Sequence, residues 1–295
     1  MNKTRPEQSE GMAALSTTRG LSEREARLLR HLASTGKDLF TVSEAQQALD
    51  SGAPYAANIL YRLTTKRWLQ RIERGKYRLI PLEAGPEAQW AEHEFRIAAT
   101  LASPSLSRSL CSGQASYYLA YATALAYYGY TERALNPIWI ATTRYRRSVI
   151  LDGVAYRFVG LSPAKFFGYT PIQLMENSIA IAEREKALAD GFDHPEYCGG
   201  VIEAAKGLWY GRDEIDLDRL IAYSRRLGNR SAMKRLGFWL ETLGTAEGGK
   251  LQELEVGDRN YPLLDPTGPH RGDRHARWRL IVNIPERQLL EWRDN

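Results

Sequence analysis

Residues 51–80, SGAPYAANILYRLTTKRWLQRIERGKYRLI, join a helical pattern directly to a hairpin pattern. Ser51 or Gly52 can cap a helix whose first turn holds Pro54, a position that proline favours. Apolar residues recur at spacings of three and four, which predicts one buried helix face (Ala56, Ile59, Leu60 and Leu63). The following segment, residues 69–80, carries four cations around Gly75, and a glycine supplies the positive φ that tight turns often need. The stretch therefore predicts a helix followed by a two-stranded hairpin.

Two further helices are predicted upstream of this stretch. In residues 21–34, Ser22 and Glu25 have the spacing of a capping box, and Gly36 follows as a terminator. Residues 41–50 form a second, shorter amphipathic segment. Three helices followed by a hairpin are typical of a winged helix-turn-helix, which we expect over residues 21–85, preceded by a flexible arm over residues 1–20.

The face of the third helix opposite its apolar side suits DNA. Hydroxyl, amide, guanidinium and ammonium groups are those that pair with base edges and phosphates in a major groove. This interpretation selects Tyr55, Asn58, Arg62, Thr65 and Lys66. The alternative is that this polar helix face is merely solvated. The position of the helix directly before a hairpin favours the DNA-binding interpretation.

The hairpin is expected to act as a DNA-contacting wing. Strand alternation predicts that Ile72, Tyr77 and Leu79 face inward and that Glu73 and the cations of the strands face solvent. The predicted phosphate or minor-groove contacts are Arg71, Arg74, Lys76 and Arg78. A solvated surface hairpin is the alternative, and some winged helices bind protein instead.

The excess positive charge of the chain is concentrated in this first module. The chain of 295 residues has a formal net charge of +5. Residues 21–80 contain eleven Lys or Arg against six Asp or Glu, whereas residues 81–295 contain 26 against 27. A basic module joined to a neutral one suggests binding to a polyanion.

Composition bounds the remaining possibilities. Hydrophobic residues make up 43% and charged residues 25%, which is the ordinary globular mixture. The sequence shows no apolar run of the roughly 18 residues that a membrane span requires, and residues 1–20 lack the apolar segment of a signal peptide. The two cysteines, Cys111 and Cys198, form no metal-binding pair. We therefore expect a cytoplasmic protein without a membrane partner, metal or cofactor.

A second module follows Pro81, Gly85 and Pro86, and we expect a mixed α/β domain over residues 86–295. Residues 115–132 are apolar nearly all round and predict a buried helix that ends at Gly129. Strands are predicted within 137–143, 145–153, 154–161 and 276–284, a strand followed by a helix in 178–192, and helices in 200–211, 216–227 and 230–244. The overall fold class is α+β, or mixed α/β, with an N-terminal winged helix-turn-helix.

Catalytic motifs are not apparent in the second module. The sequence has no phosphate-binding loop, dinucleotide fingerprint, zinc-protease motif or serine-nucleophile motif. Glu183, Glu185, Asp190 and Asp193 gather near His194, and Glu183 could pair with Lys186. Charges on a helix surface explain this cluster better than a catalytic carboxylate pair does. The basic run RYRR, residues 144–147, could extend a DNA footprint, although a solvated turn is the favoured interpretation.

Several stretches together resemble the AbiEi family, antitoxins of type IV toxin–antitoxin systems, and in particular its mycobacterial members. The resemblance runs from about Leu21 to Gly244 and is carried by WLQRIERGKYRL, YYLAYATALAYYGYTE, NPIWIATT, REKALADGFDHPEYCGG and KRLGFWLETLG. It implies an N-terminal winged helix and a larger α/β domain. The sequence beyond Gly244 contributes nothing to this resemblance.

The resemblance implies a cytoplasmic, non-enzymatic transcriptional autorepressor that binds inverted repeats of double-stranded DNA in its operon promoter. It also implies counteraction of a cognate nucleotidyltransferase-like toxin, which need not occur through a stable complex. By analogy alone, Glu185, Lys186 and Asp190 are tied to antitoxin function, and a structural role for them is the alternative. Two other functions stay open: a nucleic-acid-modifying enzyme that uses the winged helix for targeting, and a protein-interaction module that sequesters the toxin directly.

Overall fold

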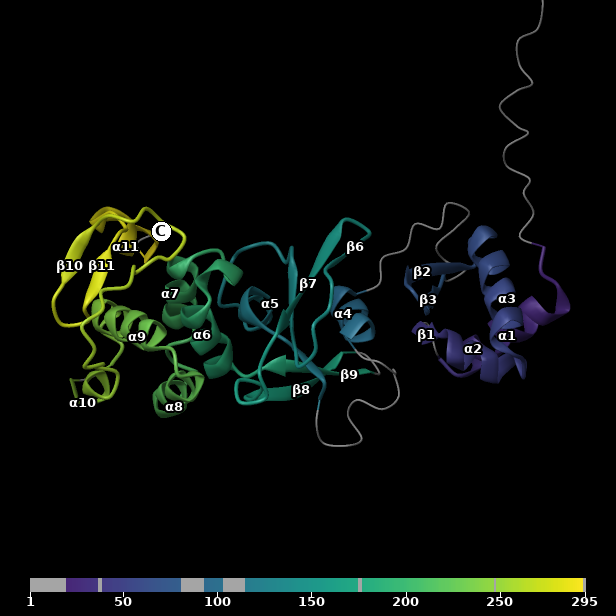
Figure 1. Ribbon diagram of the computed structural model, residues 1–295, viewed down its shortest axis with the longest axis horizontal. Coiled ribbons are helices and arrows are strands. Elements are labelled where there is room, and N and C mark those ends of the chain that lie inside the picture. The colour runs from purple at the N-terminus through teal and green to yellow at the C-terminus, as the bar shows by residue number, and fades with distance from the viewer. Residues whose placement is uncertain are drawn as a thin grey trace, which may run out of the picture. The chain divides into compact units, whose positions relative to one another are not determined.

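The computed structural model describes residues 20–36, 39–80, 93–102, 115–174, 177–246 and 248–293. The chain divides into two compact units, Met1–Glu92 and His93–Asn295 (Figure 1). The expected arm over residues 1–20 lies almost wholly outside the described residues, as do residues 81–92 between the two modules. None of the helices that the structure describes is both long enough and apolar enough to cross a membrane.

The N-terminal unit has the element order of a winged helix-turn-helix. Its helices are α1 (Glu23–Ser34), α2 (Val42–Leu49) and α3 (Ala53–Thr65), and its strands are β1 (Leu39–Thr41), β2 (Leu69–Glu73) and β3 (Lys76–Leu79). Both α1 and α2 begin with complete capping boxes, formed by Ser22 with Glu25 and by Thr41 with Glu44. Gly52 is the N-cap of α3, and Pro54 lies in its first turn. The predicted helices and hairpin are thus confirmed.

A small sheet completes this unit, and the sequence analysis missed one of its strands. The strand order is β1-β3-β2, with β3 antiparallel to both neighbours. Strand β1 has only three residues, too few for the alternation that marks a strand in a sequence. Gly75 adopts φ +83° in the turn between β2 and β3. The helices pack their apolar faces into one core that includes Leu28, Phe40 and Leu60.

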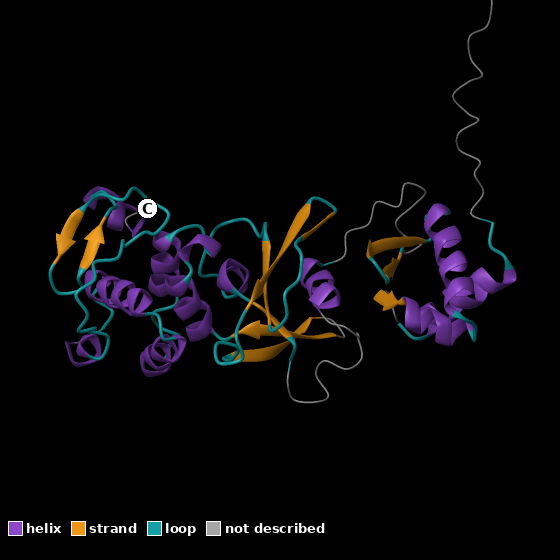
Figure 2. Ribbon diagram, in the orientation of Figure 1, coloured by secondary structure: helices purple, strands orange, loops and turns teal. Residues whose placement is uncertain are grey.

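The C-terminal unit is built on a six-stranded mixed sheet (Figure 2). Its strands are β4 (Tyr117–Leu119), β5 (Ile138–Thr142), β6 (Val149–Leu151), β7 (Val154–Gly160), β8 (Tyr169–Leu174) and β9 (Asn177–Ala182). They lie in the order β6-β7-β5-β4-β9-β8. The pairs β5–β7 and β4–β9 are parallel and the other neighbours antiparallel.

Helices cover this sheet and extend the unit. Helix α4 (Glu94–Ala102) packs on β4, β5 and β9, and α5 (Tyr121–Tyr127) contacts β5 and β9 from the other side (Figure 1). The following helices are α6 (Arg184–Asp193), α7 (Val201–Tyr210), α8 (Leu217–Leu227), α9 (Arg230–Leu243), α10 (Gly248–Gln252) and α11 (Glu286–Leu290), with single 3₁₀ turns at Pro195–Tyr197 and Glu291–Arg293. A second, two-stranded sheet pairs β10 (Asp273–His275) with β11 (Leu280–Val282).

The mixed α/β fold class is confirmed, but the expected single helix over residues 115–132 is wrong. Its first part is strand β4, and only Tyr121–Tyr127 is helical before the chain turns at Gly129, where φ is +74°. Strand β4 lies between β5 and β9 and is buried along its whole length. A strand buried on both faces has a continuous apolar sequence, which is the same pattern that a buried helix produces.

Candidate nucleic-acid interface

The polar face of α3 lies at the surface, as the helical spacing predicts. Tyr55, Asn58, Arg62 and Thr65 are exposed, whereas Ala56, Ile59, Leu60 and Leu63 are buried on the opposite side. The Thr65 hydroxyl donates to the Tyr61 carbonyl oxygen at 3.0 Å, so its oxygen remains able to accept. Helix α3 therefore presents a phenol, an amide, a guanidinium and a hydroxyl along one exposed strip.

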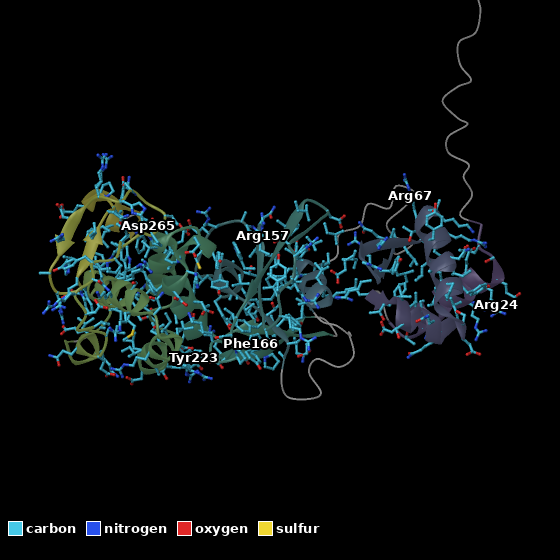
Figure 3. All side chains as sticks on the ribbon, viewed as in Figure 1. Arg24, Arg67, Arg157, Phe166, Tyr223 and Asp265 are labelled. Atoms are coloured by element: carbon cyan, nitrogen blue, oxygen red, sulfur yellow. The ribbon has the colours of Figure 1, made fainter. Side chains whose placement is uncertain are left out.

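Two further exposed side chains extend this strip. Tyr61 is 73% exposed and follows Asn58 by three residues, so helical periodicity alone places it on the same face. Arg67 follows α3 with a left-handed φ of 57°, and its exposed side chain extends outward from the unit (Figure 3). The sequence analysis did not select either residue. The spacing could have identified Tyr61, whereas the orientation of Arg67 depends on a backbone conformation that its sequence does not predict.

Lys66, which was selected with the DNA-facing residues of the third helix, instead joins two helices. Its ammonium group lies 2.7 Å from Glu25 Oε2 and donates to the Gly20 carbonyl oxygen at 2.6 Å. The Glu25 side chain is fully buried, whereas that of Lys66 is about one third exposed. The ion pair joins the first turn of α1 to the C-terminal end of α3 and so fixes the exposed face of α3 relative to the unit.

The predicted solvent exposure of the wing cations is correct for Arg71 and Arg74 and wrong for Lys76 and Arg78. Arg71 and Arg74 are exposed. Lys76 and Arg78 are only 8% and 3% exposed. Tyr77 and Leu79 do pack against the core, as predicted.

The position of β3 contributes to the burial of its two cations. This strand lies in the middle of the sheet, so side chains of both neighbouring strands flank those on its outer face. Arg78 lies between Leu39 of β1 and Gln70 of β2. Lys76 lies between Thr41 and Glu73, and its ammonium group pairs with the Glu73 carboxylate at 2.9 Å. Strand β1, which the sequence analysis did not predict, thus flanks both cations on the side opposite β2.

The second set of candidates, on α6, is buried rather than exposed. Lys186 is fully buried, and its ammonium group pairs with Asp190 one turn later and donates to the Tyr118 hydroxyl at 3.1 Å. The same ammonium lies 4.9 Å from the centre of the Phe167 ring, close enough for a cation–π contact. Burial raises the pKa of Asp190, and the Lys186 ammonium opposes that effect. These contacts attach α6 to the sheet through β4.

The other carboxylates of the cluster also serve packing contacts. Glu185 Oε1 accepts from the Asp216 backbone N–H at 3.0 Å, at the start of α8. Glu183 does not pair with Lys186, because its carboxylate accepts from the Tyr223 hydroxyl at 2.6 Å. Asp193 is bonded to Lys165 at 3.0 Å and to Asn229 at 2.5 Å. Among the described residues, no group of three or more His, Cys, Asp or Glu side chains is arranged to hold a metal ion.

Comparison with known proteins identifies the first module. Residues 27–80 match a family described as transcriptional regulator, AbiEi antitoxin. The AbiEi resemblance is confirmed over this module. The matched AbiEi segment begins within α1 and ends at the close of the wing, so it contains all of the exposed α3 and hairpin residues described above.

The AbiEi match does not extend to the C-terminal unit, where similarity is seen at the level of fold. A crystal structure of the Rv2827c protein from Mycobacterium tuberculosis superimposes with a TM-score of 0.66 at 17% sequence identity, over 94% of this chain and 97% of that one. At this identity the likeness shows a shared fold alone. No functionally curated protein matches the chain. Glu185, Lys186 and Asp190 lie outside the AbiEi-matched segment.

Proposed function

We propose that the chain is a cytoplasmic, non-enzymatic DNA-binding autorepressor and antitoxin that counteracts a nucleotidyltransferase-like toxin. The exposed polar strip of α3, within a module that matches an AbiEi transcriptional regulator family, carries the proposal. A winged helix inserts its third helix in the major groove and contacts the adjacent backbone with its wing. Inverted repeats in the promoter of its own operon are the proposed double-stranded DNA target.

The solvent exposure of each side chain determines which DNA-binding role we assign to it. Tyr55, Asn58 and Arg62 approach base edges in the major groove, and Thr65 lies at its margin. Arg71 and Arg74 hold phosphates or enter the minor groove. Lys66, Lys76 and Arg78 were candidates for the same roles, but their ion pairs and burial favour positioning of α3 and the hairpin.

Fluorescence anisotropy distinguishes these roles. It measures binding to two fluorescein-labelled duplexes, one from the chain's own promoter and one of unrelated sequence. Asn58→Ala should lower affinity for the promoter by about 5- to 150-fold, the equivalent of about 1–3 kcal/mol, with little change for the unrelated duplex. Arg71→Ala combined with Arg74→Ala should weaken both duplexes alike, because phosphates carry no sequence information. Arg259→Ala with Arg271→Ala removes the same charge from exposed positions of the other unit and is the matched control. Binding by both test variants that equals the parent's would refute the assigned face.

The antitoxin role can be separated from the stability of α6. Asp190→Ala leaves the Lys186 charge buried without its partner, at a cost of about 3–5 kcal/mol, whereas Lys186→Met with Asp190→Leu replaces both charges by apolar groups and should recover most of that loss. We expect the wild-type chain to restore growth of cells expressing the toxin-like nucleotidyltransferase of the same operon. If the pair acts through structure, the double variant also restores growth. A folded double variant that fails would show a direct antitoxin role for these side chains, and failure of the wild type would remove the antitoxin proposal.

The enzyme alternative gains no support from the described residues. The carboxylates that could have formed a catalytic pair are engaged in the buried contacts of α6.

A further inference from the structure

Strand β6 forms one edge of the six-stranded sheet and presents an apolar side chain to solvent. It pairs with β7 on one side, and no other described strand lies on its outer side. Ile150, at the centre of β6, is 75% exposed. Edge strands are usually protected by charged side chains or proline, because an open edge invites another chain to pair with it. Apolar exposure at the centre of this edge is therefore unusual.

The backbone of Ile150 faces the same open edge. Leu151 pairs with Val154 across the two-residue turn Asp152–Gly153, and Val149 pairs with Tyr156. Residues that flank a two-residue hairpin turn exchange hydrogen bonds, and hydrogen-bonded pairs alternate along an antiparallel ladder. The N–H and C=O of Ile150 consequently point away from β7, where an added strand could bond to both.

A basic connection that is anchored by hydrogen bonds precedes this strand. The Arg146 guanidinium donates to the Leu101 carbonyl oxygen and lies 6.0 Å from the centre of the Phe158 ring. The Thr142 hydroxyl donates to the Arg144 carbonyl oxygen at 2.7 Å. These anchors leave Arg144 and Arg147 exposed on either side of Tyr145, which is 87% exposed. The connection is thus more than a loosely solvated turn.

The charge around the edge is strongly positive. Arg157 is exposed on β7 (Figure 3) and lies on the same face as Ile150, because Ile150 pairs with Ala155 two residues before it. Residues 143–157 contain four arginines and one acid, whereas residues 81–295 are nearly neutral as a whole. Two copies of this edge would bring eight arginines together against two acids, so net charge disfavours self-pairing.

We propose that the β6 edge binds an extended acidic segment of a partner protein, which adds to the sheet as a seventh strand. Main-chain hydrogen bonds to Ile150 would supply the pairing, and an apolar side chain of the segment would cover Ile150. Acidic residues on the segment would meet Arg144, Arg147 and Arg157, and tyrosine and arginine are the residue types that most often dominate protein interfaces. Nucleic acid could use the arginines and Tyr145, but it would leave Ile150 and its outward peptide groups without a role. The proposal does not depend on DNA binding by the N-terminal unit.

Synthetic peptides test this surface on the full chain. The probe is a fluorescein-labelled nine-residue peptide with alternating valine and threonine at its centre and two acidic residues at each end, and a lysine-ended peptide is its counterpart. The acidic peptide should bind at least tenfold more tightly than the lysine-ended one by anisotropy. Hydrogen exchange of the β6 amides should slow when it binds, which a purely electrostatic contact in the connection would not cause.

Three variants separate backbone pairing from charge. Ile150→Pro removes the outward N–H without removing a ladder bond, a substitution that edge strands accept, and should weaken acidic-peptide binding at least tenfold. Arg144→Ala with Arg147→Ala should weaken the acidic peptide several-fold and reduce the discrimination between the two peptides. Arg259→Ala with Arg271→Ala again matches the loss of charge and should bind like wild type. Circular dichroism confirms that each variant is folded.

Three results would overturn the proposal. The first is absence of acidic-peptide binding at millimolar concentration, and the second is binding that Ile150→Pro leaves unchanged. The third is tight binding of a single-stranded thymidine oligonucleotide that is lost in Arg144→Ala with Arg147→Ala but kept in Ile150→Pro, which would identify a nucleic-acid contact instead.

Discussion

At the residue scale, Glu25 shows how one carboxylate positions the proposed DNA-binding helix. It completes the capping box of α1 by accepting from the Ser22 backbone N–H at 2.7 Å, and the same oxygen pairs with Lys66 at the end of α3. Burial acts against its ionised form, but the hydrogen bonds from Lys66 and Ser22 outweigh burial and hold the pKa of Glu25 below its ordinary value of 4.5. A capping residue visible in the sequence is therefore also a tertiary contact.

This lowered pKa predicts an acid-sensitive N-terminal unit. A carboxyl with a depressed folded-state pKa stabilises the fold fully above its ordinary pKa, and that contribution is lost as pH falls through the folded-state value. Wild-type α1 amides should lose hydrogen-exchange protection as pH falls below about 4.5, compared at each pH with Glu25→Gln. The variant should be less protected at pH 7 and should lack this step.

Lys66→Met is the companion change. It should destabilise the unit at pH 7 by about 1–3 kcal/mol, because it leaves a buried carboxylate without its strongest partner. Equal protection of Lys66→Met and wild type at pH 7 would contradict the role assigned to the ion pair.

At the element scale, one close contact between α9 and the segment that follows it depends on a glycine. A Cβ placed on Gly237 of α9 would lie 2.1 Å from the ring of Trp278, so the glycine leaves the space that the indole occupies. Trp278 is nearly fully buried, and its indole N–H donates to Glu241 one turn further along α9. Trp278 comes just before β11, so this contact docks the C-terminal hairpin on α9.

Gly237→Ala should therefore destabilise the C-terminal unit despite the higher helix propensity of alanine. Overpacking of this kind costs about 1–3 kcal/mol or more, because the bulky indole is enclosed and cannot shift freely. Gly248→Ala, in α10, meets no atom within 4 Å and should change stability by less than about 0.5 kcal/mol. Chemical denaturation of both variants measures the difference. Similar midpoints for the two would show that Trp278 moves aside at little cost.

At the scale of the whole molecule, the excess cations belong to the N-terminal unit, but not all of them can reach DNA. Six cations of the third helix and the wing were expected to contact DNA. Burial of Lys76 and Arg78 and the ion pair of Lys66 leave Arg62, Arg71 and Arg74 as the exposed candidates among the proposed contacts. The structure thus lowers the electrostatic contribution that we expect to DNA affinity.

Three cations that displace counterions from the duplex, Arg62 in the major groove and Arg71 and Arg74 on the wing, predict a measurable salt dependence. The slope of log K against log salt should be roughly −2.7, which corresponds to a fall in affinity of about 40-fold between 50 and 200 mM salt. Arg71→Ala with Arg74→Ala should make the slope shallower by about 1.8. Titrations of promoter duplex at several salt concentrations provide both values. A slope near zero for the wild type would exclude the phosphate contacts, and a slope steeper than −4 would show that more cations take part.

Short-range signals in the sequence determined the winged module almost completely. The capping boxes at Ser22 and Thr41, the spacing of Ala56 to Leu63 and the turn at Gly75 each depend on residues within a few positions of one another. The exposed strip of α3 follows from the same periodicity. In the C-terminal unit, strands β5, β6, β7 and β9 and helices α6 to α9 were predicted in the same way.

Only the tertiary structure decided which charged groups are available and which apolar runs are strands. Lys76 and Arg78 lie in a central strand that β1 flanks, and the neighbours β5 and β9 make Tyr117–Leu119 a strand. Tyr118 contacts Lys186 across 68 residues of sequence. Among the described strands, β6 lies at an edge because of its place in the strand order, which no local pattern records. Helix caps and turns depend on nearby residues, whereas burial depends on pairing partners brought together from distant parts of the chain.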